Sequence, residues 1–426
     1  MGSISRLAQR AIRRGPRAVL RKAVTAVQLM KAEGAGATVR YARGKFASVA
    51  APRVPKMLVS LDDAAVVDWT ELPPRITDPV TTSGPAKIAW IMSPPGRESG
   101  GHQNLFRFID FAERAGHECR IYLYSADGHG NDVVAVRTML ESSDAYPTLK
   151  ASIEPWRRED GVASDTDALF ATGWETAYPA FRDESRAKRF YFVQDYEPYF
   201  YPLGSEAVLA ENTYRFGFHG ITAGGWLAHK LHNEFGMATD HFDFGVDTSL
   251  YARTNDGPRN EVFFYARPVT PRRAFEFGLL ALTDLKRMKP DVVVNFAGWD
   301  VSNWKIPFEY VNLRSLPLSE LSAVYNRCAA GLVMSLSNMS LLPLELMACG
   351  ATPVVNDGQN NRLVSDNPYI DYVPASPLAI ARRLAHAVDR PDAIEHSRAM
   401  AASVQSADWE SSGAAFVRAM EAALRG

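Results

Sequence analysis

Apolar residues along the chain form short continuous runs separated by amphipathic stretches and polar loops. Such runs predict parallel strands that are buried on both faces of a sheet. We expect strands at residues 87–92, 119–124, 167–172, 189–193, 261–266, 291–296, 331–335 and 352–355. Helices are expected at residues 104–115, 319–329, 344–349 and 408–424, with a further one opening at Ser376. Strands alternating with helices predict an α/β fold with doubly wound, Rossmann-like sheets.

Loop chemistry divides this pattern into parts. Residues 255–260 are rich in Gly, Pro, Asp and Asn, which predicts a hinge. We therefore expect a first α/β domain at residues 87–255, a second at 256–405, and a C-terminal helix at 406–426. Residues 57–86 are proline-rich and aperiodic, which predicts an extended linker.

Composition adds a basic N-terminal arm to this picture. The chain has 426 residues, 46% apolar and 22% charged, which is enough for two globular domains. Residues 1–56 hold thirteen Lys and Arg against one acid, Glu33. Residues 5–31 alternate apolar and basic positions, which suits docking on an anionic membrane surface. A solvated tail, a helix packed on the body and a transit peptide remain alternatives. Nucleic acid is not expected as a partner, because the arm is poor in aromatic residues and the body is acidic.

The remaining composition favours a reducing compartment. Cys119, Cys328 and Cys349 have neither disulfide nor metal-site spacing. No apolar run reaches membrane-spanning length, and no secretory signal is evident. We expect a cytoplasmic protein, with the arm as a route to the inner face of the cytoplasmic membrane, and neither a cofactor nor a metal ion.

The stretch 337–361 holds the strongest candidate for chemistry. A polar loop, which includes Ser337, Ser340 and Leu341, precedes a short helix in which we expect Pro343 at the first position. Loop amides that converge on a helix N-terminus attract anions, and Glu345 is placed to accept hydrogen bonds from ribose hydroxyls. An ordinary strand–helix connection with a solvated Glu would have the same spacing.

Candidate binding residues follow the strands of both domains. Loops after the C-terminal ends of parallel strands face the ligand in open α/β sheets. Arginine suits phosphate oxygens, and carboxylates, amides and aromatic rings suit sugars. In the first domain the candidates are Gly100, Gly101, His102, Trp174, Glu175, Gln194, Asp195 and Glu197. In the second they are Arg267, Arg272, Arg273 and Gly298. Packed surface loops and exposed arginines are the alternatives.

Several of these segments together resemble GT-B glycosyltransferases of family 4. The similarity rests on Glu345, on Met347-Ala348-Cys349-Gly350 and on Pro353-Val354-Val355. The stretch YFVQDYEPYFYPLGS at residues 191–205 is similar to the WsaF-like rhamnosyltransferase branch. The chain departs from the family at Ser337, where a Glu is usual, and at Gln194, where a His is usual.

The resemblance implies a GT-B fold, with two Rossmann-like domains facing a cleft and a last helix that crosses back to the first domain. It implies a retaining, metal-independent sugar transfer from a nucleoside-diphosphate donor, with L-rhamnose from dTDP-L-rhamnose as the expected sugar. A glycan or lipid-linked glycan in bacterial surface polysaccharide synthesis is the expected acceptor. Arg267 and either Arg272 or Arg273 would contact the donor diphosphate. Gln194, Asp195 and Glu197 are the catalytic candidates, and Asp195 and Glu197 are the nearest of them for acceptor contact or deprotonation. A non-catalytic glycan- or nucleotide-binding subunit, or an epimerase of the same fold, is the alternative.

Overall fold

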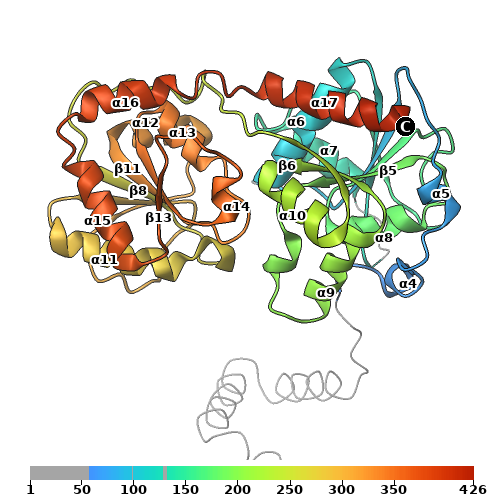
Figure 1. Ribbon diagram of the computed structural model, residues 1–426, viewed down its shortest axis with the longest axis horizontal. Coiled ribbons are helices and arrows are strands. Elements are labelled where there is room, and N and C mark those ends of the chain that lie inside the picture. The colour runs from blue at the N-terminus through green and yellow to red at the C-terminus, as the bar shows by residue number, and fades with distance from the viewer. Residues whose placement is uncertain (1–56, 98, 128–131) are drawn as a thin grey trace, which may run out of the picture. The chain divides into compact units, whose positions relative to one another are not determined.

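The computed structural model of the protein describes residues 57–97, 99–127 and 132–426 (Figure 1). The predicted basic arm at residues 1–56 lies outside this part, so its membrane role stays a prediction. Within the described ranges, no helix is both long enough and apolar enough to span a membrane.

The first domain is built on a seven-stranded parallel sheet. Its strands are β1 (Lys87–Met92), β2 (Glu118–Leu123), β3 (Ser152–Pro155), β4 (Ala168–Ala171), β5 (Lys188–Val193), β6 (His219–Ala223) and β7 (Ala238–Phe242). Their order across the sheet is β3-β2-β1-β4-β5-β6-β7. Because every pair is parallel, the C-terminal ends of all seven strands meet at one edge.

The second domain repeats this plan with six parallel strands. They are β8 (Glu261–Tyr265), β9 (Val293–Ala297), β10 (Val311–Arg314), β11 (Cys328–Val333), β12 (Thr352–Asn356) and β13 (Asp371–Val373). The order across this sheet is β10-β9-β8-β11-β12-β13. The loops after β8, β9 and β11, which contain the predicted donor residues, therefore leave neighbouring strands at the same edge.

Helices cover both faces of the sheets (Figure 1). They are α4 (Leu61–Ala64), α5 (Pro74–Thr77), α6 (Gly100–Arg114), α7 (Val133–Glu141), α8 (Trp174–Arg182), α9 (Ser205–Asn212), α10 (Gly225–Phe235), α11 (Phe275–Met288), α12 (Leu318–Arg327), α13 (Leu342–Ala348), α14 (Gln359–Arg362), α15 (Pro377–Val388), α16 (Ala393–Ala402) and α17 (Trp409–Arg425). Three short 3₁₀ turns are η1 (Glu197–Phe200), η2 (Thr213–Arg215) and η3 (Pro271–Arg273).

Burial explains why the strands read as continuous apolar runs. One face of the first sheet packs against α8 and α10, and the other packs against α6 and α17. Trp90 of β1 is fully buried and stacks on Phe170 of β4, with 4.1 Å between ring centroids. Residues of β1, β4 and β5 are therefore almost all buried, as covered parallel strands require.

The last helix, α17, packs on the first domain, where it lies along α6 and β7 (Figure 1). Phe416, Met420 and Leu424 enter the same core as β1 and α6. Asp408 caps the helix by accepting from the backbone N–H of Ser411 at 2.6 Å.

The structure corrects several local expectations. The helix expected at 319–329 is α12, which ends at Arg327, because Cys328 already begins β11 and pairs with Glu261 of β8. The N-cap residue of α12 is Pro317, so the helix begins at Leu318. Leu342, not Pro343, opens α13, and Pro343 follows it. Gly350 has the left-handed conformation expected after that helix, with φ of 81°.

Residues 57–86 are not simply an extended linker, because α4 and α5 form within them. The side chain of Asp63 is fully buried and anchors α4. It accepts from Arg158 at 3.0 Å, Arg182 at 2.7 Å and Tyr124 at 3.0 Å. Sequence periodicity misses such short helices because long-range ion pairs hold them in place.

Candidate active site

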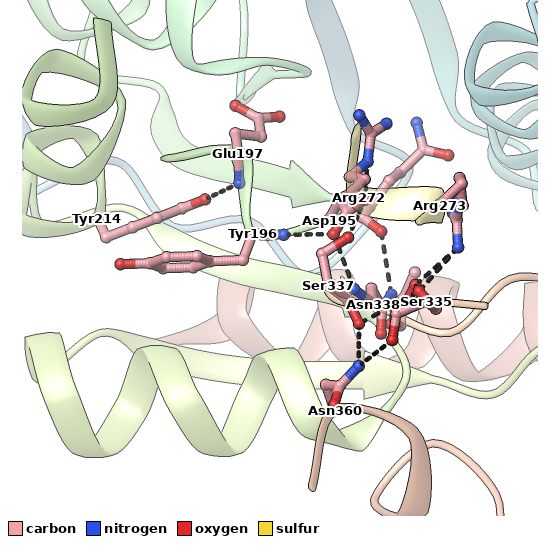
Figure 2. A network of polar contacts seen from close by, with 12 residues as sticks. Asp195, Tyr196, Glu197, Tyr214, Arg272, Arg273, Ser335, Ser337, Asn338 and Asn360 are labelled. Atoms are coloured by element: carbon pink, nitrogen blue, oxygen red, sulfur yellow. Dashed lines mark hydrogen bonds and ion pairs between the residues drawn. The ribbon is translucent and has the colours of Figure 1, made fainter. Parts of the chain in front are cut away.

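The loop after β5 carries the most connected of the predicted residues, Asp195, which is only 8% exposed. Its Oδ1 accepts from the backbone N–H groups of Tyr196 and Asn338, both at 2.9 Å. Its Oδ2 accepts from Ser337 Oγ and from Arg272 Nε, both at 3.1 Å (Figure 2). One carboxylate of the first domain thus joins two loops of the second. Both its oxygens are occupied, which favours a structural use of this predicted catalytic residue.

Gln194 is also bound within the protein. Its Nε2 donates to the carbonyl of Gly101 at 3.0 Å, and its Oε1 accepts from Asn104 at 3.1 Å. Gly100 and Gly101 form the first turn of α6 rather than the loop that sequence predicts. A Cβ on Gly101 would lie 3.6 Å from the Gln194 amide, so the backbone of Gly101 here lies close to the Gln194 side chain rather than to a ligand.

Glu197, the third predicted catalytic residue, lies inside the first domain. Its Oε2 accepts from the backbone N–H of Trp174 at 2.6 Å and from Tyr191 Oη at 2.7 Å. Burial, reinforced by the nearby Glu175, raises the pKa of Glu197 to about 8. The carboxyl group is therefore largely protonated at neutral pH and positions the start of α8.

The other acceptor-side candidates are similarly engaged. The Trp174 ring is buried, and its Nε1 donates to Tyr201 Oη at 2.9 Å, so the ring is not free to cover a sugar face. Glu175 Oε1 accepts from Ser93 Oγ at 2.7 Å. His102 contacts Ser99 Oγ at 2.7 Å, and burial lowers the pKa of His102.

The arginines after β8 differ from these residues and from one another. Arg273 Nη1 donates to Ser335 Oγ at 2.8 Å, and burial lowers the pKa of its guanidinium. Arg272 donates through Nε to Asp195. The Cζ of Arg267 lies 5.8 Å from the centre of the Tyr265 ring, and the Arg267 side chain has no hydrogen bond or ion pair with any residue in the described ranges. Arg267 and the Nη atoms of Arg272 thus retain donors for an anionic ligand.

Glu345 lies in the first turn of α13. Its Oε2 is 3.4 Å from Tyr325 Oη, a long and weak contact. Burial raises the pKa of Glu345 to about 7, against the opposite influence of Tyr325 and of Arg107 on α6. Because α13 has seven residues and no side-chain cap, its N-terminus adds little to anion binding.

The remaining donor-side candidates divide into packing and loop residues. Gly298 has φ of 106°, and a Cβ there would lie 2.4 Å from the Tyr265 ring, so packing alone requires glycine. Ser337 is fully buried against Asp195. Ser340 is partly exposed, and Leu341 is the N-cap residue of α13.

Sequence reasoning missed the asparagines that hold the loop after β11. Asn356 accepts from the Ser335 backbone N–H at 2.7 Å and donates to the Ser335 carbonyl at 2.8 Å. Asn360 donates to that carbonyl at 3.0 Å and also binds the Ser337 carbonyl (Figure 2). Asn338 Nδ2 bridges to the carbonyls of Gln194 at 3.0 Å and Ala223 at 2.8 Å. The Asn-rich run at 356–361 was the available signal.

Two parallel, helix-covered sheets define a GT-B fold, and solved structures bear this out. HepE of Anabaena, in complex with UDP-glucose, matches with a TM-score of 0.57 and 14% identity, over 79% of this chain and 100% of that one. A glycosyltransferase from Rickettsia africae matches with a TM-score of 0.56 and 11% identity, over 80% and 100%. At these identities the likeness shows the fold alone.

Two family models match parts of the chain. The WsaF N-terminal domain matches residues 156–223, and the WsaF C-terminal domain matches residues 260–385. The chain carries both WsaF domains on a GT-B fold, which confirms the resemblance seen in the sequence. The O-antigen biosynthesis protein RfbC of Myxococcus xanthus is 34% identical over 310 residues, which cover 70% of this chain and 24% of that protein. The chain thus matches about a quarter of that relative's length.

Proposed function

We propose that the protein is a glycosyltransferase that moves a sugar from a nucleoside-diphosphate donor to a glycan acceptor. The observation that carries this proposal is the group of guanidinium donors at the end of β8, in a domain that matches the WsaF C-terminal model. Arg267 and Arg272 suit a diphosphate, which guanidinium groups bind in fork geometry.

In this proposal the second domain binds the donor. Arg267 and Arg272 stabilise the charge that develops on the leaving diphosphate. The Glu345 carboxylate accepts hydrogen bonds from the ribose hydroxyls. The first domain contributes the acceptor side, with its β5 loop joined to the donor side through Asp195. We infer from the family resemblance that the transfer retains the anomeric configuration and needs no metal ion. The arginines would supply the positive charge at the leaving group. The described residues hold no cluster of three or more metal-binding side chains.

The substrate proposal is more specific. We propose L-rhamnose from dTDP-L-rhamnose as the sugar, because residues 191–205 resemble the WsaF-like rhamnosyltransferase branch. The name of the M. xanthus relative supports an acceptor in O-antigen or another surface polysaccharide. A lipid-linked acceptor at the inner face of the cytoplasmic membrane would suit the basic arm.

A non-catalytic nucleotide- or glycan-binding subunit is the second candidate. Gln194 and Ser337 stand where the family has titratable groups, and both are held in hydrogen bonds inside the protein. A binding subunit would bind nucleotide and give no turnover, whereas a transferase would release nucleoside diphosphate when donor and acceptor are both present.

Thermal shift with dTDP, UDP, GDP and ADP tests the proposal first. A ligand at a hundred times its dissociation constant stabilises a protein by about 2.7 kcal/mol, which a melting curve detects easily. A selective shift with dTDP supports the rhamnose donor, and a selective shift with another nucleotide keeps the transferase but replaces the sugar. If none of the four shifts the melting temperature, the donor site is refuted.

A further inference from the structure

Arg272 of the second domain is held by two residues of the first. Its Nε donates to Asp195 Oδ2 at 3.1 Å, and its Cζ lies 3.9 Å from the centre of the Phe200 ring. Asp195 follows β5, Phe200 ends η1, and Arg272 lies in η3. One edge and one face of the guanidinium are thus fixed from across the domain boundary.

Asp195 is itself immobilised, which makes it an effective anchor. Besides Arg272, it accepts from the backbone of Tyr196, the backbone of Asn338 and the hydroxyl of Ser337. Four hydrogen bonds on a carboxylate that is 8% exposed leave it little freedom to follow a moving partner. The position of Arg272 is therefore set by the β5 loop.

The opposite edge of the Arg272 guanidinium remains available. Its Nη1 and Nη2 have no partner among the residues that the structure describes, and Figure 2 shows this end pointing away from Asn338. Arg273 is different, because its Nη1 is used by Ser335 and Asn338. Of the two arginines that the sequence left as alternatives, Arg272 has both Nη groups open to a phosphate, whereas Arg273 has one of its two Nη groups occupied.

We propose that Asp195 and Phe200 are positioning residues that orient Arg272 toward the donor diphosphate. This inference rests on the proposed function and deepens it. Holding a guanidinium before the ligand arrives removes side-chain ordering cost from the binding step. Donor binding is thereby linked to contact between the two domains, because Asp195 and Phe200, which hold the phosphate-binding arginine, belong to the acceptor-side domain.

Asp195→Asn tests this most directly. The Asn carbonyl can still accept from the Tyr196 and Asn338 backbones, but its NH₂ cannot accept from Arg272. Calorimetry on the full chain would use the nucleoside diphosphate that binds best among dTDP, UDP, GDP and ADP, and its parent nucleoside. We expect about tenfold weaker diphosphate binding and unchanged nucleoside binding, since only the phosphate contact loses its pre-organisation.

A second variant and a control keep the test decisive. Phe200→Leu removes the ring under the guanidinium and keeps the ion pair, so about threefold weaker diphosphate binding is expected, as for a modest cation–π contact. Asp284→Asn removes a comparable carboxylate that pairs with Arg287 at 2.7 Å on the exposed side of α11, and should change nothing.

The outcomes separate this inference from the function. Unchanged or tighter diphosphate binding in both Asp195→Asn and Phe200→Leu would overturn the positioning role, with the donor site intact. Equal losses for nucleoside and diphosphate would overturn it too, because they would indicate general distortion. A wild-type protein that binds none of the four diphosphates would refute both proposals.

Discussion

The loop after β5 and the loop after β8 hold similar numbers of charged and polar residues but use them differently. After β5, the side chains of Gln194, Asp195 and Glu197 are all bound to other parts of the protein. After β8, the side chain of Arg267 has no hydrogen-bond or ion-pair partner in the described ranges, and the guanidinium of Arg272 has only one edge occupied. The two loops leave parallel sheets of the same design, so topology alone does not account for the difference.

Burial accounts for it. A buried polar group must be hydrogen-bonded inside the protein, whereas a partly exposed one can be hydrogen-bonded to water until a ligand binds. Asp195 and Glu197 are 8% and 7% exposed, while Arg267 is only half-buried. We therefore expect changes after β5 to act on stability and geometry, and changes after β8 to act on ligand binding.

The largest expected effect is the loss of stability in Glu197→Ala. Truncation leaves the Trp174 N–H and the Tyr191 hydroxyl without their partner in a buried site. Each such loss costs about 1–3 kcal/mol, so we expect the free energy of unfolding to fall by about 2–6 kcal/mol. Urea denaturation measures this directly. Glu184→Ala, on an exposed side chain of the same domain, is the matched control. A loss below about 0.5 kcal/mol, typical of surface substitutions, would contradict the structural role.

The pH dependence of stability sharpens the same contrast. Burial raises the pKa of Glu197 from 4.5 to about 8, so the folded protein retains a proton that the unfolded chain releases. This contribution to stability is complete below pH 4.5 and is lost as the pH rises to about 8. The slope from this group is at most about 1.4 kcal/mol per pH unit. Glu197→Gln, which cannot ionise, should flatten the curve of unfolding free energy between pH 5 and 8. An unchanged slope in that variant would show that Glu197 is already ionised.

Arg267→Ala should lower ligand affinity and leave stability unchanged, which is the reverse of the effect expected for Glu197→Ala. Hydrogen bonds to charged groups are worth about 1.5–3 kcal/mol, so nucleoside-diphosphate affinity should fall by about ten- to a hundredfold. The free energy of unfolding should not change, because the Arg267 side chain has no hydrogen bond or ion pair in the described ranges. Calorimetry and urea denaturation on one preparation give both numbers. Arg287→Ala, an exposed arginine of the same domain, is the control. Lower stability with unchanged affinity would reverse the assignment of the two loops.

Much of the fold was predictable because buried parallel strands leave a strong apolar signal. β1 lies at residues 87–92 as predicted, and β5, β8 and β12 differ from expectation by one residue. The predicted ends of strands and helices were wrong where a contact with a residue distant in the sequence decides them. Cys328 joins a strand through pairing with β8, and Asp63 holds α4 through Arg158 and Arg182.

The candidate site was predictable by residue type but not by use. Strand-end position marked Asp195 and Arg272 as candidate ligand contacts, yet local sequence cannot reveal that they bind each other across 77 residues. The different hydrogen bonding of Arg272 and Arg273 also cannot be predicted from the sequence. It depends on Ser335 and Asn338, which occupy only Arg273.

The smallest expected effect concerns Glu345, which combines features of both loops. Burial raises the pKa of Glu345 to about 7, yet the only hydrogen bond of its carboxyl group in the described ranges is the long contact with Tyr325. Ribose hydroxyls donating to the carboxylate would favour its ionised form, so donor binding should release a proton. Nucleoside-diphosphate affinity should then rise between pH 6 and 8, by about tenfold at most if only the ionised form binds. Glu345→Gln should abolish this rise while keeping a carbonyl acceptor. If wild type and Glu345→Gln show the same pH profile, Glu345 does not bind the donor. The donor contacts proposed for the second domain are then confined to its arginines.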